Sequence, residues 1–292
     1  MTKWTESDIP AQHGRTFVVT GSNSGLGAAA AAAIAKAGGK VVLACRNTAK
    51  ADEVARSIGA NATVAKLDLA DLSSVRAFAD SIDAVDVLIN NAGVMALPKR
   101  QTADGFEMQI GTNHLGHFAL TGLLLDKIGD RVVTLSSQAH QMGKIDLDDL
   151  NWERRRYQRW LAYGQSKLAN LLFAFELQRR LANAGSKVIS VAAHPGYAST
   201  NLQSHTESFL DAVMKFGNGI VAQSAQMGAL PELYAATAPD VTGGSYYGPD
   251  GFGGMRGYPT RSGSTARSKD EVMARKLWEL SEKLTGVNYQ FD

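Results

Sequence analysis

Short apolar runs alternate with longer amphipathic stretches over the first two thirds of the chain. The runs are rich in β-branched residues and almost continuously apolar, as strands buried on both faces are. They occupy 17–20, 40–44, 63–66, 86–90, 131–135 and 187–193. Stretches with helical period separate them, over 25–37, 49–57, 72–82, 103–127 and 157–182. This alternation predicts an α/β fold, a Rossmann-type doubly wound parallel sheet flanked by helices on both faces.

The pattern loosens after Pro195. We expect two helices between 207 and 237, a glycine-rich segment over 243–263 and a last helix over 269–284. This part is short and lacks an alternating pattern of its own, so it is predicted to flank the same domain. The expected organisation is one domain over 1–292, in which 197–292 forms a substrate-loop and lid extension.

The composition and the net charge indicate which kinds of partner the protein is expected to bind. The chain has 292 residues, 45% of them hydrophobic, and a net charge of only +2, which gives no electrostatic reason to expect nucleic acid or a membrane surface. A small molecule is the expected partner. Cys45 is the single cysteine, so a disulfide within the chain and a cysteine metal cluster are excluded. With no signal peptide recognised and no apolar stretch longer than 28–35, the expected location is the cytoplasm.

A glycine-rich turn, TGSNSGLG, follows the first predicted strand and precedes an alanine-rich helix. Glycine lets the backbone approach a pyrophosphate, and a helix N-terminus attracts phosphate charge. The spacing departs from G-x-G-x-x-G, and glycines also serve as simple turn formers. The position after the first strand favours a dinucleotide site, with expected contacts from Gly21, Ser22, Asn23, Ser24, Gly25, Leu26 and Gly27.

The ends of the next strands bear on the choice of dinucleotide. Arg46 follows the second strand, where no carboxylate is present to take a ribose hydroxyl, and a guanidinium there suits the extra phosphate of NADP. NADP(H) is therefore favoured while NAD(H) stays open, and Arg46 could instead be a solvated surface residue. Asp68 and Leu69 end the third strand near the expected adenine edge, although Asp68 could equally cap a helix. Further contacts are expected from the NNAG motif after the fourth strand, at Asn91, Ala92 and Gly93.

Tyr163 and Lys167, in the segment YGQSK, are the main candidates for chemistry. They lie four residues apart in a predicted helix and so share one face. A free tyrosine has a pKa near about 10, and a neighbouring cation favours the phenolate. We expect Lys167, together with an oxidised nicotinamide, to lower the pKa of Tyr163. The pair is common by chance, so its weight comes from the accompanying motifs.

Taken in order, TGSNSGLG, NNAG, Ser137 after the fifth strand, YGQSK and HPG resemble the short-chain dehydrogenase/reductase family over about residues 14–202. The resemblance implies that Ser137 hydrogen-bonds the substrate oxygen, Tyr163 exchanges the proton and Lys167 binds the nicotinamide ribose. It also implies that Asn113 holds a water for proton relay. The segment HPGYASTNL resembles the family's carboxamide-binding segment, which adds Pro195, Gly196 and Thr200.

The gap from Ser137 to Tyr163 is longer than in the family's commonest members. With its KIDLDDL and YGQSKLANLLF segments, the chain is similar to the retinol dehydrogenase and protochlorophyllide reductase-like branch. That similarity implies an apolar, bulky carbonyl substrate, while the C-terminal part differs from the branch's animal members. The resemblance also implies a homodimer or homotetramer formed through the two long helices. The arginine run 154–156 is interpreted as a solvated helix start rather than a site for an acidic substrate group.

Three functional interpretations stay open at this point. They are an NADP(H) oxidoreductase, a redox-sensing regulator that binds dinucleotide without turnover, and an epimerase or lyase on the same fold. The complete set of Ser137, Tyr163 and Lys167 favours the oxidoreductase. His114 and His117 lie three residues apart but have no third ligand of fitting spacing, so no metal site is expected.

Overall fold

Among the described residues, eight strands form one sheet. The structure is a computed structural model, and it describes residues 3–197 and 223–291. The strand order is β3-β2-β1-β4-β5-β6-β7-β8, and neighbours are parallel except for the antiparallel pair β7 and β8. The strands are β1 Thr16–Thr20, β2 Lys40–Cys45, β3 Ala62–Lys66, β4 Val85–Asn90, β5 Ile128–Leu135, β6 Ile189–Ala193, β7 Tyr246–Pro249 and β8 Pro259–Arg261.

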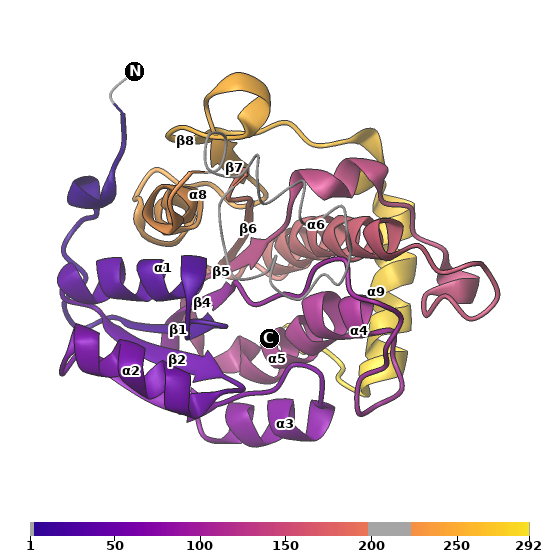
Figure 1. Cartoon of the computed structure of the whole chain (residues 1–292), viewed down its shortest axis with the longest axis horizontal. Helices are drawn as coiled ribbons and strands as arrows, with labels where there is room; N and C mark the ends of the chain where they lie inside the picture. Colours follow the sequence, from indigo (N-terminus) through magenta and orange to yellow (C-terminus); the bar gives the residue numbers. More distant parts are fainter. Residues whose placement is uncertain (1–2, 198–222, 292) are drawn as a thin grey trace.

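Helices cover both faces of this sheet, so the predicted Rossmann-type α/β fold is confirmed (Figure 1). The helices are α1 Gly25–Lys36, α2 Thr48–Ile58, α3 Leu72–Asp80, α4 Met108–Ile110, α5 Gly116–Leu124, α6 Arg159–Asn183, α8 Ala225–Thr237 and α9 Glu271–Thr285. A π-helical turn, Gly111–Leu115, joins α4 to α5. Within the described ranges, no helix has the length and apolar character needed to cross a membrane.

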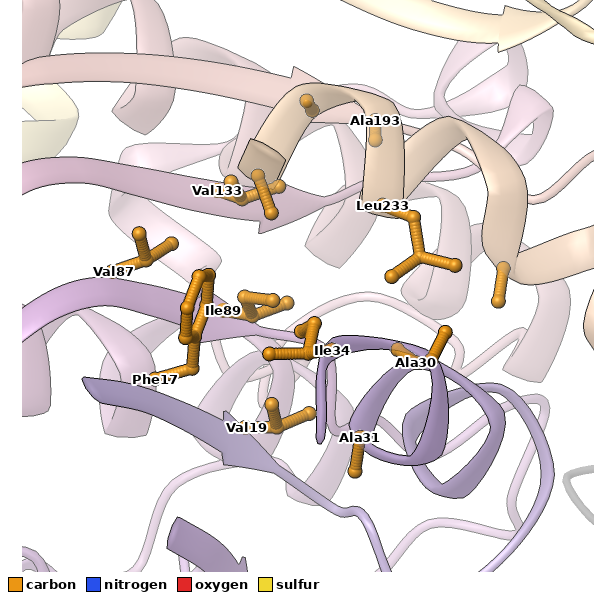
Figure 2. Close-up of a cluster of buried hydrophobic side chains, with 14 of the residues drawn as sticks. Phe17, Val19, Ala30, Ala31, Ile34, Val87, Ile89, Val133, Ala193 and Leu233 are labelled. Carbon is orange, nitrogen blue, oxygen red and sulfur yellow. The ribbon is translucent and has the colours of Figure 1, made fainter. Parts of the chain in front are cut away.

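Alternate residues of β1 point into two separate cores. Phe17 and Val19 lie in the core with Ile34 of α1 and Leu233 of α8, as Figure 2 shows. Val18 points to the opposite face, into the core that contains Phe118 of α5. All three β1 side chains are fully buried, and each such burial contributes about 1.5–3 kcal/mol. The alternation therefore fixes which face of the sheet each helix covers.

The glycine-rich segment contains two strands that the sequence did not predict. In β7, Tyr246 and Tyr247 pair with Ala192 and Ala193 of β6, and β8 then pairs with β7. All six predicted strands are present, and the sheet contains two strands more than the sequence predicted. Both added strands are short and lie among turn residues, so their pairing depends on the edge that β6 offers rather than on local pattern.

The helix expected over 103–127 is shorter and interrupted. It begins at Met108, where the Glu107 side chain accepts hydrogen bonds from the amides of Gln109 and Ile110. The π-turn then interrupts it, and α5 ends at Leu124. Of the two helices expected between 207 and 237, α8 is the second, and 198–222 lies outside the described residues.

The C-terminal helix packs on α5 and α6 (Figure 1, yellow). Trp278 is 2% exposed and contacts the rings of Phe118, Phe173 and Tyr289. The Tyr289 hydroxyl donates a 2.6 Å hydrogen bond to the main-chain oxygen of Phe118. Part of the surface that the long helices were expected to offer to another copy is therefore covered by the chain's own α9.

Candidate active site

The glycine turn between β1 and α1 is pressed against the loop that follows β4. Gly21 has a φ of +68°, and a Cβ placed on it would lie 2.8 Å from the Ala92 Cβ. A Cβ on Gly27 would lie 2.5 Å from the Asn91 side-chain nitrogen. Gly25 also has a positive φ, of 59°. The turn thus needs glycine at these positions, and it leaves backbone at the N-terminus of α1 in the arrangement that suits a pyrophosphate.

The residues of this turn differ in which of their groups could contact a bound cofactor. Ser22 is fully buried, and its hydroxyl donates to the Val19 oxygen at 2.8 Å, so only its backbone can serve a ligand. Ser24 is the N-cap of α1 but makes no capping hydrogen bond with its side chain. Asn23 and Leu26 are half-buried beside it.

The NNAG loop is tied to the end of β1. The Asn91 amide donates to the Thr20 main-chain oxygen at 2.6 Å, and the Ala92 N–H donates to the Thr20 hydroxyl at 2.9 Å. A Cβ on Gly93 would lie 3.2 Å from the Asn113 Oδ1 and 3.5 Å from the Lys167 Nζ. The loop therefore connects the glycine turn to the candidate chemical residues, which were far apart in the sequence.

Arg46 and Asp68 lie where the sequence placed them, after β2 and β3. Arg46 is exposed, and none of the described residues forms an ion pair or hydrogen bond with it. Asp68 accepts a hydrogen bond from the Ala70 amide at 3.0 Å, whereas the N-cap of α3 is Asp71. The alternative of Asp68 as a helix cap was therefore wrong. Leu69 is buried against α5 at Gly116, whose added Cβ would lie 2.4 Å from the Leu69 oxygen.

Tyr163 lies beside Ser137. The Tyr163 side chain is 6% exposed, and the Ser137 side chain is near enough to its hydroxyl to influence the pKa of the phenol. Burial raises the pKa of Tyr163 to about 12, while the Ser137 hydrogen bond acts in the opposite direction. Desolvation of the phenolate is therefore the largest influence on this pKa, and the lowering expected from Lys167 together with an oxidised nicotinamide stays a prediction. At neutral pH Tyr163 is a protonated phenol.

Lys167 lies one helical turn beyond Tyr163 and is also buried. Its Nζ is 5.8 Å from the centre of the Tyr163 ring and donates to the Leu135 oxygen at 3.2 Å. Burial lowers the pKa of Lys167 to about 8. No carboxylate of residues 3–197 or 223–291 forms an ion pair with Lys167, so its buried ammonium has hydrogen atoms to donate to a ribose.

Asn113 lies in the π-turn and uses its whole side-chain amide. Its Oδ1 accepts from the Val94 amide at 2.7 Å, and its Nδ2 donates to the Val94 oxygen and the Ser166 hydroxyl, each at 2.9 Å. The side chain therefore holds the loop after Gly93, a role that the sequence did not indicate.

The HPG motif ends β6 beside the glycine-rich segment. Gly196 has a φ of +68°, and the Tyr197 amide donates to the Met255 oxygen at 2.7 Å. Pro195 accepts a hydrogen bond at its oxygen from the Gln223 side chain. The expected contact at Thr200 lies outside the described residues.

The long segment between Ser137 and Tyr163 packs on itself. Arg155 stacks over Trp152 at 3.7 Å and pairs with Asp149, whose carboxylate also accepts from the amides of residues 153–155. Arg154 and Arg156 are exposed. The expected solvation therefore holds for Arg154 and Arg156 only. The run is not a helix start, because α6 begins at Arg159, and Arg155 packs against Trp152 and Asp149.

Sequence reasoning missed several residues near the chemical groups. Trp160 stands one turn before Tyr163, with ring centres 6.3 Å apart at 82°. The His140 ring hydrogen-bonds the Ser137 oxygen at 2.7 Å, and Gln138 donates to the Gly253 oxygen. Trp160 could have been found from its i, i+3 spacing to Tyr163. The contacts of His140 and Gln138 could not, because they depend on the three-dimensional course of the loops.

No group of three metal-ligating side chains is found in the part of the chain that the structure describes. His114 hydrogen-bonds Ser281, and His117 hydrogen-bonds Thr20 and Asn113. Each histidine is thus engaged with protein groups.

The chain is similar to proteins of one known family. The family model "short chain dehydrogenase" matches residues 15–210. The chain belongs to the short-chain dehydrogenase/reductase family. It is 42% identical to human (Homo sapiens) retinol dehydrogenase 13 over 293 residues, which cover 94% of this chain and 85% of the relative. It is 39% identical to the polyprenol dehydrogenase of Mus musculus over 297 residues, covering 96% and 86%.

A solved structure is more similar still. The crystal structure of an uncharacterized protein from Mycobacterium Paratuberculosis superposes with a TM-score of 0.87 at 52% identity, covering 99% of this chain and 100% of that one. The chain is thus a short-chain dehydrogenase/reductase of the retinol dehydrogenase branch, an NAD(P)-dependent enzyme that acts on alcohol or carbonyl groups.

Proposed function

We propose that this enzyme is NADP(H)-dependent and transfers hydride between the nicotinamide and an apolar carbonyl or alcohol, with Tyr163 as the acid/base. The observation that carries the proposal is the buried Tyr163 phenol, which lies beside the Ser137 side chain and one helical turn from Lys167. The spatial meeting of these three groups from two elements is what the chemistry of the family requires.

In reduction, Tyr163 donates its proton to the substrate oxygen, and Ser137 hydrogen-bonds the same oxygen as negative charge develops on it. A bound nicotinamide supplies the hydride that reaches the carbonyl carbon. A phenol with a pKa of about 12 is protonated at neutral pH and therefore ready to act as the acid. Oxidation reverses these steps, and Tyr163 then accepts the proton.

Lys167 holds the nicotinamide ribose in this proposal and assists Tyr163 when the phenolate forms. Asn113 contributes to proton relay through a water. Because its amide is occupied by Val94 and Ser166, that water would bind the Asn113 main-chain oxygen, which already accepts from His117. A carbonyl oxygen has two lone pairs, so it can accept from more than one donor.

The preference for NADP(H) is proposed from Arg46. Its side chain is exposed after β2, free of ion pairs with the described residues, and no carboxylate ends that strand. A guanidinium binds phosphate oxygens with charge-assisted hydrogen bonds. Backbone of the turn over 21–27 would hold the pyrophosphate, Asp68 and Leu69 the adenine, and residues 91–93 and 195–196 the nicotinamide half.

An apolar substrate is proposed for two reasons. The Trp160 ring stands beside Tyr163, and the relatives are named for retinol and polyprenol, which are apolar alcohols. A small molecule is the expected partner, and no nucleic-acid or membrane partner is proposed. A homodimer or homotetramer stays a prediction, as does the cytoplasmic location; self-association would need a surface that α9 leaves open.

The test is NADPH and NADH consumption with retinal, a long-chain aldehyde and glyceraldehyde. We expect the two apolar substrates to have kcat/KM values at least tenfold higher than glyceraldehyde, since each buried CH₂ contributes roughly 0.8 kcal/mol. Tight NADPH binding without turnover of any substrate would instead favour the dinucleotide-sensing regulator. Preference for glyceraldehyde would contradict the apolar site.

A further inference from the structure

Two buried histidines, His114 on the π-turn and His117 just after it, hydrogen-bond protein groups. We propose that His117 is a positioning residue that locks the π-turn carrying Asn113 to the end of β1 and to the cofactor-side loop after β4. The inference rests on the proposed function, because it concerns how that site is held in register. The inference goes beyond the proposed function by assigning a role to His117 and Thr20.

The near side of the link is the bond between His117 and Asn113. The His117 Nδ1 lies 3.0 Å from the Asn113 main-chain oxygen. A carbonyl oxygen can only accept, so Nδ1 carries the proton. Burial, with a smaller contribution from Lys167, lowers the pKa of His117 to about 4, which leaves the ring neutral at neutral pH. Its Nε2 is therefore an acceptor.

The far side of the link runs through Thr20. The His117 Nε2 lies 2.9 Å from the Thr20 hydroxyl, which must donate to it. The same hydroxyl accepts from the Ala92 amide at 2.9 Å, and the Thr20 oxygen accepts from the Asn91 side chain at 2.6 Å. An unbroken chain of hydrogen bonds thus joins Asn113 to the NNAG loop.

The π-turn explains why such a link is needed. A π-turn adds one residue to a helical turn and interrupts the ordinary i to i+4 pattern of hydrogen bonds. Here the Gly116 amide bonds the Gly111 oxygen, and the His117 ring supplies a donor to the Asn113 oxygen. Asn113 in turn fixes Val94, two residues beyond Ala92. The loop is thus held at Ala92 through Thr20 and at Val94 through Asn113.

His114, on the same turn, offers an internal comparison. Its Nε2 lies 2.9 Å from the Ser281 hydroxyl of α9, and that hydroxyl donates to the Leu277 oxygen. This link leads away from the cofactor loop toward the C-terminal helix. Removing the Ser281 hydroxyl therefore tests a buried hydrogen bond to the π-turn that does not reach the loop.

The experiment compares His117→Ala, His117→Asn, Thr20→Val and the control Ser281→Ala in the full chain. The measurements are Tm, kcat and KM at saturating NADPH, the pH profile of kcat, and amide exchange of the peptide containing 90–95. Thr20→Val keeps the shape of the side chain and removes only the hydroxyl, so it tests the link even where His117→Ala fails to fold.

We expect Thr20→Val and His117→Ala to lower kcat at least tenfold, with less effect on KM, and to speed exchange at 90–95. His117→Asn, which keeps an N–H near the position of Nδ1, should recover part of the kcat lost in His117→Ala. Ser281→Ala should keep the wild-type kcat, pH profile and exchange at 90–95. Wild-type kcat and exchange in Thr20→Val would overturn the proposal.

The exchange measurement separates the two proposals. If the wild-type protein turns over none of the substrates, the proposed function fails, yet faster exchange at 90–95 in Thr20→Val would still support the link. If the wild type is active and Thr20→Val is indistinguishable from it, the positioning role fails while the oxidoreductase function stands.

Discussion

Asn113 holds the backbone of Val94 with two hydrogen bonds, accepting from its amide at 2.7 Å and donating to its oxygen at 2.9 Å. The pair joins the π-turn to the loop beyond Gly93. An amide side chain is suited to this role because it offers a donor and an acceptor side by side.

Asn113→Ala should therefore destabilise the loop after Gly93 and lower the rate of the reaction. It leaves the Val94 amide and oxygen without these partners, at a cost of about 1–3 kcal/mol for each group that stays buried. We expect urea unfolding to show that loss and kcat to fall at least tenfold. Thr121→Val is the control, because it removes a hydroxyl of α5 that accepts from Asn90 at the end of β4. Equal kcat losses in the two variants would count against a specific role for Asn113.

Arg46→Asp should change the cofactor preference. Losing charge-assisted hydrogen bonds to a phosphate is expected to weaken NADPH binding by roughly 10- to 100-fold, with little loss for NADH. The affinities can be measured by quenching of protein fluorescence. Arg56→Asp makes the same charge change on the exposed surface of α2 and should leave the affinity ratio unaltered. An unaltered ratio in Arg46→Asp would remove Arg46 from the phosphate site.

Because of the buried carboxyl group of Glu232, we expect the free energy of unfolding to depend on pH. Glu232 is 2% exposed on α8, both carboxyl oxygens lack hydrogen-bond partners among the described residues, and burial raises its pKa to about 8. The unfolded chain releases this proton near pH 4–5, so the folded state loses relative stability as pH rises from there to about 8, by at most about 1.4 kcal/mol per pH unit.

Glu232→Gln removes that titration. The variant should have nearly the wild-type unfolding free energy at pH 5 and a higher one at pH 8, as followed by chemical denaturation. A difference between the two proteins that stays constant from pH 5 to 8 would show that Glu232 does not titrate in this range.

Trp278→Ala should be among the most damaging changes outside the site. The indole is 2% exposed, stacks on Phe173 and lies under the Arg180 guanidinium at 4.4 Å. We expect a loss of about 3–5 kcal/mol in the free energy of unfolding. Val272→Ala, at a position 54% exposed on the same helix, should change it by under about 0.5 kcal/mol. A small loss in Trp278→Ala would mean that α9 contributes little to the core.

The sequence predicted the elements whose pattern is local. The six predicted strands and the helix bearing Tyr163 follow from hydrophobic period, and they are found close to the expected bounds. The sequence did not predict the strands that depend on pairing between distant residues. Tyr246 and Tyr247 form a strand only because β6 offers them an edge, and no local pattern announces this.

The same division holds in the site. The spacing of Tyr163 and Lys167 predicts that they share a face, and they do, but the pKa of Tyr163 is governed by burial, which spacing does not convey. Likewise, nothing in TNHLGHF shows that His117 reaches Thr20, since that contact joins residues 97 positions apart.

The most direct test of the central claim is Tyr163→Phe, with NADPH affinity and turnover of an apolar aldehyde measured on the same preparation. The change removes the hydroxyl that Ser137 contacts and keeps the ring. The account predicts NADPH affinity within about twofold of wild type and turnover lower by roughly 10²–10⁴-fold, the usual contribution of a general acid. Turnover at the wild-type rate would contradict it.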